Sequence, residues 1–173
     1  MLTQERVQEV FDYVEVRFRW KVRTSNRIKL GDLTGGIGKD GYRFTGIDEK
    51  LYPDHQLIFL YHHGYIPEND IDHIDRNPLN NRIENLREVS RSCNSRNCGL
   101  RVTNRSGVTG VSWDTKEGKW AANIVVNRRK IHLGTHSALP EAVAHRLAAE
   151  QAENWPGCNS RSPAYVFMMG LRA

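Results

Sequence analysis

The sequence predicts an α+β protein, and three observations support this fold class. The chain has 173 residues, which is room for one ordinary domain or two small ones. Residues 71–97 read as a strand, a long polar loop, a second strand and a helix. From residue 106 onward, three segments alternate between apolar and polar residues before an alanine-rich helical pattern. We therefore expect short strands and helices in more than one small unit.

Residues 1–65 are expected to form a β-rich segment. The patterns predict a helix over residues 3–14, a strand over 14–22, a hairpin over 41–52 and a buried helix over 54–64. Thr3 is the expected N-cap of the first helix, and Gly64 is the expected end of the last one. No residue in this segment indicates chemistry by itself.

The central segment has the clearest local order. Its predicted elements are strands over residues 71–74 and 86–89, a loop over 75–85 and a helix over 91–97. The loop is rich in Asp, Asn and Pro, which favour turns, and Ser90 is a good N-cap for the helix.

The excess positive charge is concentrated in the C-terminal part of the chain. Lys and Arg outnumber Asp and Glu by 25 to 20, which gives a formal net charge of +5. Residues 51–100 carry 5 basic and 7 acidic side chains, whereas residues 101–139 carry 7 basic and 2 acidic ones. A basic region beside a centre with several carboxylates indicates one part that holds a polyanion and another that holds a cation.

Membrane and secreted classes are not indicated. No apolar stretch approaches the roughly 18 residues of a membrane span, and the first residues lack the apolar core of a secretory signal. The three cysteines are too few for a disulfide scaffold, which favours a reducing compartment. We expect a cytoplasmic protein with no membrane partner.

Four residues of the central segment stand at a characteristic spacing. Asp72 and His73 are adjacent, Asn85 follows His73 by twelve residues, and Asn94 follows nine residues later. Together with the run NPLNNRIENLR, this pattern resembles the HNH nuclease motif of phage homing endonucleases, in the variant that ends in asparagine. The resemblance covers residues 55–97 and implies a ββα-metal fold.

The resemblance also implies a role for each of these side chains. His73 would be the general base, and Asp72 and Asn94 would hold the metal. Asn85 would orient the loop and the histidine through hydrogen bonds. Apart from the resemblance, Arg91 and Arg96 lie on the predicted helix and are candidates to clamp the scissile phosphate, with an ordinary solvated helix face as the alternative for each.

The chemistry of the residue types agrees with these roles. A neutral histidine can remove a proton from water near pH 7. Carboxylate and amide oxygens are hard ligands that suit Mg²⁺, with Mn²⁺ as a substitute, and no small-molecule cofactor is expected. Because consecutive strand residues point to opposite faces, Asp72 and His73 can serve one phosphate only if the strand twists or the helix spans both. His55, where relatives also tend to carry histidine, is either a DNA contact or a structural residue.

Residues 106–154 resemble the AP2 DNA-binding domain, which is found in plant transcription factors and beside many phage HNH nucleases. The segments that carry this resemblance are SGVTGVSW, GKWAANI, KIHLGT and EAVAHRLAAEQAEN. One face of the expected sheet is apolar and should pack on the helix: Val111, Trp113, Trp120, Ala122, Ile124, Ile131 and Leu133. The other face and its turns supply the expected DNA-binding residues: Ser112, Lys116, Asn123, Val125, Arg128, Arg129, Lys130 and His132. A three-stranded sheet fits the major groove, where Asn123 is suited to adenine.

These features predict a metal-dependent endonuclease that hydrolyses phosphodiester bonds in double-stranded DNA, as a site-preferring homing-type nuclease or a nickase. The alternative is a non-catalytic DNA-binding regulator on a degenerate HNH fold. The expected domains are a nuclease over residues 1–98, a linker over 99–105, an AP2-like domain over 106–154 and a tail over 155–173. If the protein is phage-encoded, the expected location is the host cytoplasm; the oligomeric state is left open.

Overall fold

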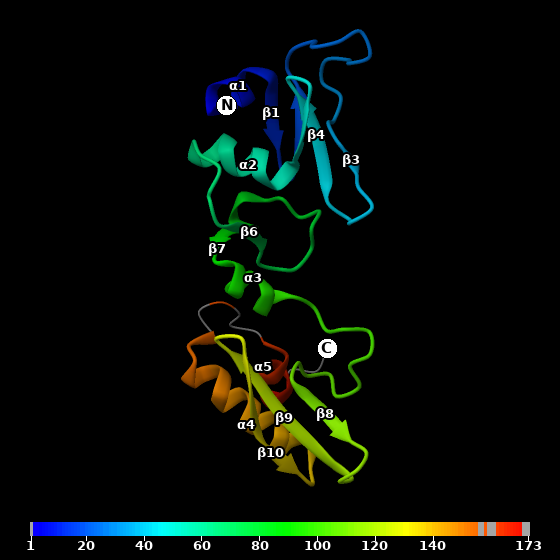
Figure 1. The fold of residues 1–173 in the computed structure, drawn as a ribbon. Coiled ribbons are helices and arrows are strands. Elements are labelled where there is room, and N and C mark those ends of the chain that lie inside the picture. The colour runs from blue at the N-terminus through cyan, green and yellow to red at the C-terminus, as the bar shows by residue number, and fades with distance from the viewer. Residues whose placement is uncertain (1, 156–157, 159–161, 171–173) are drawn as a thin grey trace. The chain divides into compact units, whose positions relative to one another are not determined.

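The computed structural model describes residues 2–155, 158 and 162–170. Contacts divide the chain into two compact units, Met1–Asn94 and Ser95–Ala173. Figure 1 labels the helices and strands of both units. Each unit is a mixture of helices and antiparallel sheet, in agreement with the predicted α+β class.

The first unit begins with a short helix and a hairpin. These elements are α1 (Gln4–Val10), β1 (Phe11–Val14) and β2 (Arg17–Trp20). Thr3 caps α1 as predicted, through a bond that its side chain accepts from the backbone of Arg6. The predicted extension of the helix to Val14 is wrong, because Phe11 is extended and pairs with Trp20 across the hairpin.

The strand predicted over residues 14–22 is confirmed for β2 (Arg17–Trp20), but its predicted start at Val14 is wrong. The chain turns at Glu15, whose φ is 57°, so Val14 and Arg17 face each other on two strands. Aromatic stacking stabilises this hairpin: the Phe11 ring lies 5.0 Å from that of Phe18. Cross-strand pairing of aromatic residues thus overrides the local helical pattern.

A small sheet and a buried helix complete this part of the unit. They are β3 (Gly36–Ile37), β4 (Arg43–Ile47), β5 (Lys50–Pro53) and α2 (Asp54–His63). The β4–β5 turn at Asp48 and Glu49 and the end of α2 at Gly64 confirm the predicted hairpin and helix. Gly64 has a φ of 81°, a conformation that glycine adopts without strain.

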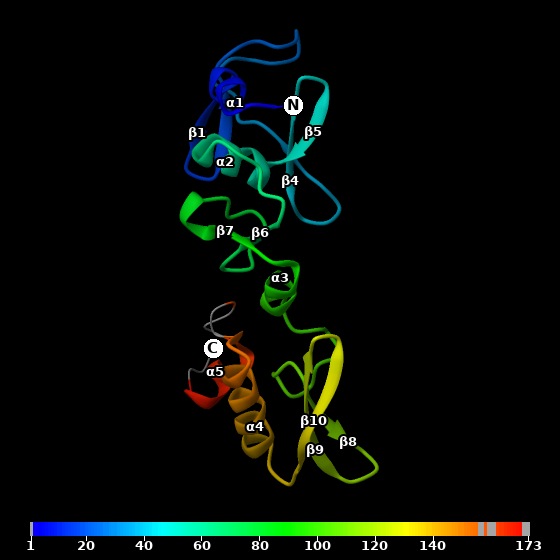
Figure 2. The same cartoon turned by 60° about the vertical axis from the view of Figure 1, so that its left-hand side comes forward.

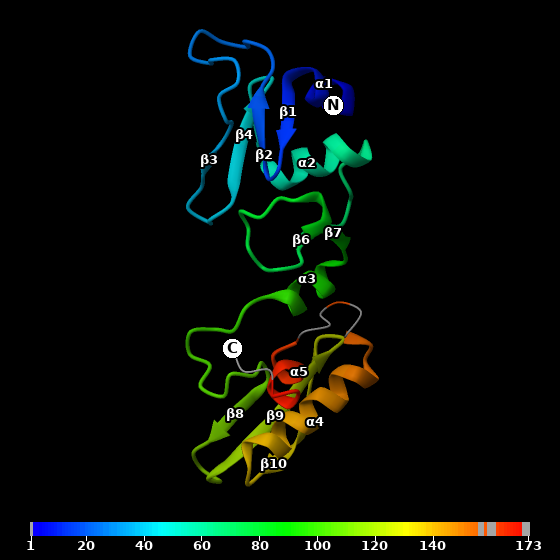
Figure 3. The ribbon, with the colours of Figure 1, turned by 180° about the vertical axis from the view of Figure 1, so that it is seen from behind.

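The core of the first unit lies where α1, the β1–β2 hairpin and α2 meet. In the view of Figure 3, α1 and α2 lie beside the two hairpin strands. The buried apolar residues of this core are Val7, Val10, Phe11, Phe18, Ile47, Leu57, Ile58, Phe59, Leu60 and Leu86. Leu86 belongs to the central segment, so this core also anchors the predicted motif.

The central segment folds as the sequence predicts. β6 (Asp70–His73) pairs antiparallel with β7 (Leu86–Val89), and α3 (Arg91–Asn97) follows. A short 3₁₀ turn, Ile83–Asn85, leads into β7. The side chain of Ser90 accepts a hydrogen bond from the backbone of Cys93, which confirms it as the cap of α3.

The second unit contains a three-stranded sheet and a long helix. Its elements are β8 (Val111–Asp114), β9 (Lys119–Val126), β10 (Arg129–His136), α4 (Leu139–Ala152) and α5 (Pro163–Met168). The strand order is β10-β9-β8, and α4 packs against the sheet (Figure 2). α5 packs on α4, so the described part of the expected tail belongs to this unit; residues 156–157, 159–161 and 171–173 lie outside the described residues.

Two residues expected in the core of this sheet are exposed. Cross-strand pairing puts Trp113 with Trp120 and Ile131 with Ile124, so the predicted faces agree with the register. However, Trp113 is 47% exposed and Ile131 is 44% exposed. Trp113 lies on the edge strand β8, while α4 makes most of its contacts with β9 and β10. Alternation assigns a face but not the part of that face which the helix covers.

A buried ion pair lies within α4, and its arginine also contacts the sheet. Arg146 and Glu150 are each 3% exposed at the side chain and lie 2.8 Å apart, and Ser162 donates to Glu150. Arg146 also donates to the backbone oxygen of Asn123. A Cβ at Gly110 would collide with both groups, which explains a glycine at this position. None of the described helices has the length and apolar character that a membrane span requires.

Candidate active site

The β6–β7 hairpin positions the two central residues of the predicted motif at the end of β6. Asp72 pairs across the hairpin with Arg87, and His73 pairs with Leu86. Both residues are buried, with exposed fractions of 6% for Asp72 and 5% for His73. Alternation along the strand gives Asp72 the same face as Asp70 and gives His73 the other. The two side chains point to opposite faces, but the Cα atoms of adjacent residues are only about 3.8 Å apart. At the end of the strand, one phosphate can therefore approach both Asp72 and His73.

Three residues from separate segments surround the imidazole of His73. Nε2 of His73 lies 2.8 Å from Oδ1 of Asn81. The ring centroids of Tyr42 and His55 lie 5.9 and 5.4 Å from that of His73, and 5.3 Å from each other. With the amide oxygen of Asn81 as acceptor, His73 donates from Nε2, and Nδ1 is its basic nitrogen. These three contacts hold the imidazole in position.

His55 is the neutral neighbour of the predicted base. It lies in the first turn of α2, and burial lowers its pKa from 6.5 to about 4, with a further lowering by the nearby His73. At pH 7 His55 thus carries no charge. The two rings are close to perpendicular, with an angle of 76° between their planes. The His55 ring thus contacts the ring of His73. The sequence did not reveal this contact.

Asn85 holds the loop between β6 and β7. Its Oδ1 accepts a 3.0 Å bond from the backbone of Asp75, and its Nδ2 donates to Asp75 and to the backbone oxygen of Asn80. The amide oxygen next to Nε2 of His73 belongs to Asn81, and the role of Asn85 in orienting the histidine stays a prediction. Asn85 lies in the 3₁₀ turn and faces the loop, whereas Asn81 is 1% exposed and faces the ring.

The carboxylate of Asp75 accepts hydrogen bonds from several residues of this loop. Burial alone would raise the pKa of Asp75, but hydrogen bonds from Asn80, the Asn77 backbone and Asn85 outweigh it and lower the pKa below its ordinary value. The carboxylate is therefore ionised at neutral pH and accepts all of these bonds. Arg76 next to it has a φ of 64°, the left-handed conformation that favours glycine.

The carboxylate of Asp72 is paired with an arginine. Nε and Nη2 of Arg87 donate to the same oxygen, Oδ2, at 3.0 and 2.8 Å. The exposed side-chain fraction is 28% for Arg87 and 6% for Asp72. A buried carboxylate is costly without a counter-charge, and the guanidinium of Arg87 supplies one.

Asn94 lies on the same side of the hairpin as Asp72. Its Nδ2 donates a 3.1 Å hydrogen bond to Oδ2 of Asp70, which shares a strand face with Asp72. α3 therefore carries an amide toward a face that holds two carboxylates. Carboxylate and amide oxygens form the donor set that a hard divalent cation takes, so the residues present fit the predicted ion. Arg91, the first residue of α3, is exposed.

The register puts four of the predicted DNA-binding residues on one face of the β8–β9–β10 sheet, whereas Arg129 pairs with Val126 and lies on the other face. Asn123 pairs with His132, and Val125 pairs with Lys130, so these four residues share a face. Nδ1 of His132 lies 3.3 Å from Oδ1 of Asn123. The remaining predicted residues lie on the same strands or in the two hairpin turns, and all are exposed: Ser112, Lys116, Arg128 and Arg129.

Four residues near the predicted site were missed by sequence reasoning. Asn81 lies within the quoted run, but nothing in the run distinguishes its role from that of Asn85. Arg87 and Asp70 follow from the hairpin register, which the loop length alone does not define. Tyr42 is far away in the sequence, and only the tertiary fold brings it to His73.

Comparisons with known proteins identify the central segment and one relative. The HNH endonuclease family matches residues 52–96, which include Asp72, His73, Asn85 and Asn94. Protein 3.8 of Escherichia phage T7 is 35% identical over 91 residues, which are 52% of this chain and 74% of that protein. No solved structure matches the chain. The chain therefore belongs to the family of phage T7 protein 3.8, and its residues 52–96 form an HNH endonuclease domain.

Proposed function

We propose that the protein is a metal-dependent DNA endonuclease that hydrolyses phosphodiester bonds in double-stranded DNA. The observation that carries this proposal is the burial of Asp72 and His73 at the end of β6, with Asn94 held on the Asp72 side of the hairpin. The match of residues 52–96 to the HNH endonuclease family supports the same activity.

In this proposal, His73 is the general base. Asn81 holds Nε2, so Nδ1 accepts the proton of the attacking water. Tyr42 and His55 pack against the ring and keep it from turning away. The neutral state of His55 matters, because a second positive charge at this distance would oppose protonation of His73 during the reaction.

Asp72 and Asn94 are the proposed holders of Mg²⁺, with Mn²⁺ as a substitute. The ion, when bound, supplies positive charge for the phosphate and the leaving oxygen. Asp72 contributes a carboxylate, Asn94 an amide oxygen, and α3 brings the amide to the strand. Arg91 at the exposed start of α3 is the proposed phosphate clamp.

The second unit is the proposed DNA-reading part. Its AP2-like arrangement is supported by the sheet order β10-β9-β8 with α4 packed on it, and by the exposed basic residues of β10 and of the two hairpin turns. Asn123 and His132 lie side by side in the sheet and are suited to base edges, while Lys130 and Arg129 suit phosphate or guanine. This unit would give the nuclease its site preference.

A plasmid assay tests the proposed activity. We expect supercoiled DNA to become nicked in the presence of Mg²⁺ before linear product forms, because one active site cuts one strand per visit. EDTA should abolish cutting, and Asp72→Asn should slow it by at least about a hundredfold.

The control is Asp48→Asn, which removes a surface carboxylate paired with Arg6 and should cut like the wild type. Cutting in EDTA at the full rate would contradict metal dependence. A wild-type protein that binds duplex but cuts neither plasmid nor phage DNA would favour the non-catalytic regulator instead.

A further inference from the structure

The ion pair between Asp72 and Arg87 is part of the hairpin itself. The two residues are cross-strand partners in the β6–β7 register, so the backbone sets them side by side. Two guanidinium nitrogens converge on one oxygen, Oδ2, at 3.0 and 2.8 Å. An ion pair with these distances on the protein surface would contribute little to stability. The Asp72 side chain, however, is only 6% exposed. This pair is therefore the charge compensation for a buried carboxylate.

A divalent cation and a guanidinium compete for such an oxygen. Both are attracted by the same negative charge, and they repel each other when both lie against it. Arg87 is the partner that is able to leave, because 28% of its side chain already contacts solvent. Asp72 is held in the strand and has no comparable freedom.

We propose that Arg87 is the resident counter-ion of Asp72, and that a divalent cation binds by displacing its guanidinium from Oδ2. This inference rests on the proposed function, in which Asp72 is a metal ligand. The exchange keeps the buried carboxylate compensated both before and after the metal binds. It also makes the free protein bind metal more weakly than its oxygen ligands alone would, because each binding event breaks two charged hydrogen bonds.

Manganese binding to the full chain tests this exchange without any measurement of cleavage. Free Mn²⁺ is followed by its electron paramagnetic resonance signal during titration of wild type, Arg87→Gln and Arg87→Lys. We expect Arg87→Gln to bind Mn²⁺ about tenfold more tightly than the wild type, because the guanidinium of Arg87 no longer has to leave. Arg87→Lys keeps a charge but loses the two-nitrogen fork, so its affinity should lie between the other two.

A thermal scan gives the second readout. Without metal, Arg87→Gln should melt at a lower temperature than the wild type, because Asp72 loses the two charged hydrogen bonds from Arg87. Saturating Mn²⁺ should raise its melting temperature by more than it raises that of the wild type. If Arg87→Gln does not fold, the affinity of Arg87→Lys alone decides the outcome.

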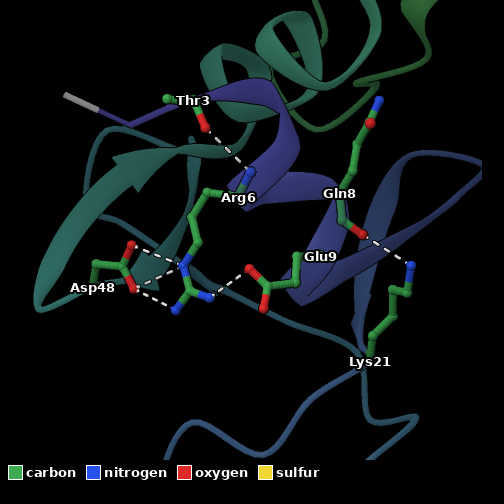
Figure 4. Close-up of polar contacts among 6 residues, drawn as sticks. All are labelled: Thr3, Arg6, Gln8, Glu9, Lys21 and Asp48. Atoms are coloured by element: carbon green, nitrogen blue, oxygen red, sulfur yellow. Dashed lines mark hydrogen bonds and ion pairs between the residues drawn. The ribbon is translucent and has the colours of Figure 1, made fainter.

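Arg6→Gln is the matched control. Arg6 also uses two nitrogens on a carboxylate, that of Asp48, but in the exposed contact between α1 and the β4–β5 turn, as Figure 4 shows. Its Mn²⁺ affinity should equal that of the wild type. Equal affinity of Arg87→Gln and wild type would overturn the exchange.

Failure of the metal site itself would look different. If the wild type binds no Mn²⁺, or if Asp72→Asn binds it as well as the wild type, Asp72 is not a ligand. The proposed function then loses its metal site, and the exchange falls with it.

Discussion

At the scale of single residues, the most informative feature is the shell around His73. The sequence indicates His73 through its spacing to Asp72 and Asn94, but it does not indicate what holds the ring. Asn81, Tyr42 and His55 contact it from three separate segments. Contacts of this kind depend on the tertiary fold, so local patterns cannot reveal them.

His55 should make stability depend on pH. Burial lowers its pKa to about 4 from 6.5, so the unfolded chain takes up a proton first as the pH falls. The wild type should therefore lose stability as the pH falls from 6.5 toward 4 through this group. The loss at pH 5 should be about 2 kcal/mol relative to neutral pH.

Urea unfolding at pH 7.5 and pH 5.0 measures this loss. His55→Gln cannot take up the proton, and it should show a smaller drop by about 2 kcal/mol. His132→Gln, which alters an exposed histidine of the second unit, should keep the full drop. An equal drop in His55→Gln and wild type would show that His55 titrates normally in the folded protein.

At the scale of elements, the central hairpin and the N-terminal helix show opposite degrees of predictability. Turn-forming residues and a capping serine mark the limits of β6, β7 and α3, so their positions could be predicted within a residue. In contrast, Val7, Val10, Phe11 and Val14 fit a helix by spacing, yet α1 ends at Val10. The aromatic pairing that extends Phe11 is a tertiary effect.

The stability of the loop between β6 and β7 should depend on the side-chain amide of Asn85. Asn85→Ala removes three hydrogen bonds that fix Asp75 and Asn80. We expect it to lower the free energy of unfolding by about 2 kcal/mol. Chemical denaturation at neutral pH measures this loss.

Asn69→Ala is the control for this substitution. Asn69 makes one exposed bond, to Glu88, and its replacement should change stability by less than about 0.5 kcal/mol. If both variants lose the same amount, the loop does not depend on Asn85, and its proposed role as a loop clamp would be wrong.

At the scale of the whole molecule, the division of the chain into two units matches the distribution of its charged residues. The basic excess of residues 101–139 belongs to the second unit, and the carboxylates of the motif belong to the first. Sequence alternation could predict which sheet residues share a face where the pairing is regular, but not the register shift between His132 and Gly134 in β10. It could not predict that Trp113 and Ile131 are exposed, since that depends on where α4 lies on the sheet.

Removal of Arg129 or Lys130 should weaken DNA binding and flatten its salt dependence. Each phosphate contact releases counterions, so each alanine variant should reduce the slope of log affinity against log salt by about 1. Fluorescence anisotropy with a labelled duplex at several salt concentrations gives this slope. Asp72→Asn added to each protein prevents cleavage during the measurement.

Lys21→Ala is the control with the same loss of charge. Lys21 already donates to the backbone oxygen of Gln8 in the first unit, as Figure 4 shows. Its slope should match that of the parent protein. If Arg129→Ala and Lys130→Ala also match the parent, the start of β10 is not part of a DNA-binding surface.

The central claim is that His73 activates water for phosphodiester hydrolysis. The most direct measurement is the single-turnover rate of plasmid cleavage by His73→Ala at saturating Mg²⁺, with duplex affinity measured on the same preparation. The account predicts unchanged affinity and a rate lowered by at least about a hundredfold. Cleavage by His73→Ala at the wild-type rate would contradict it.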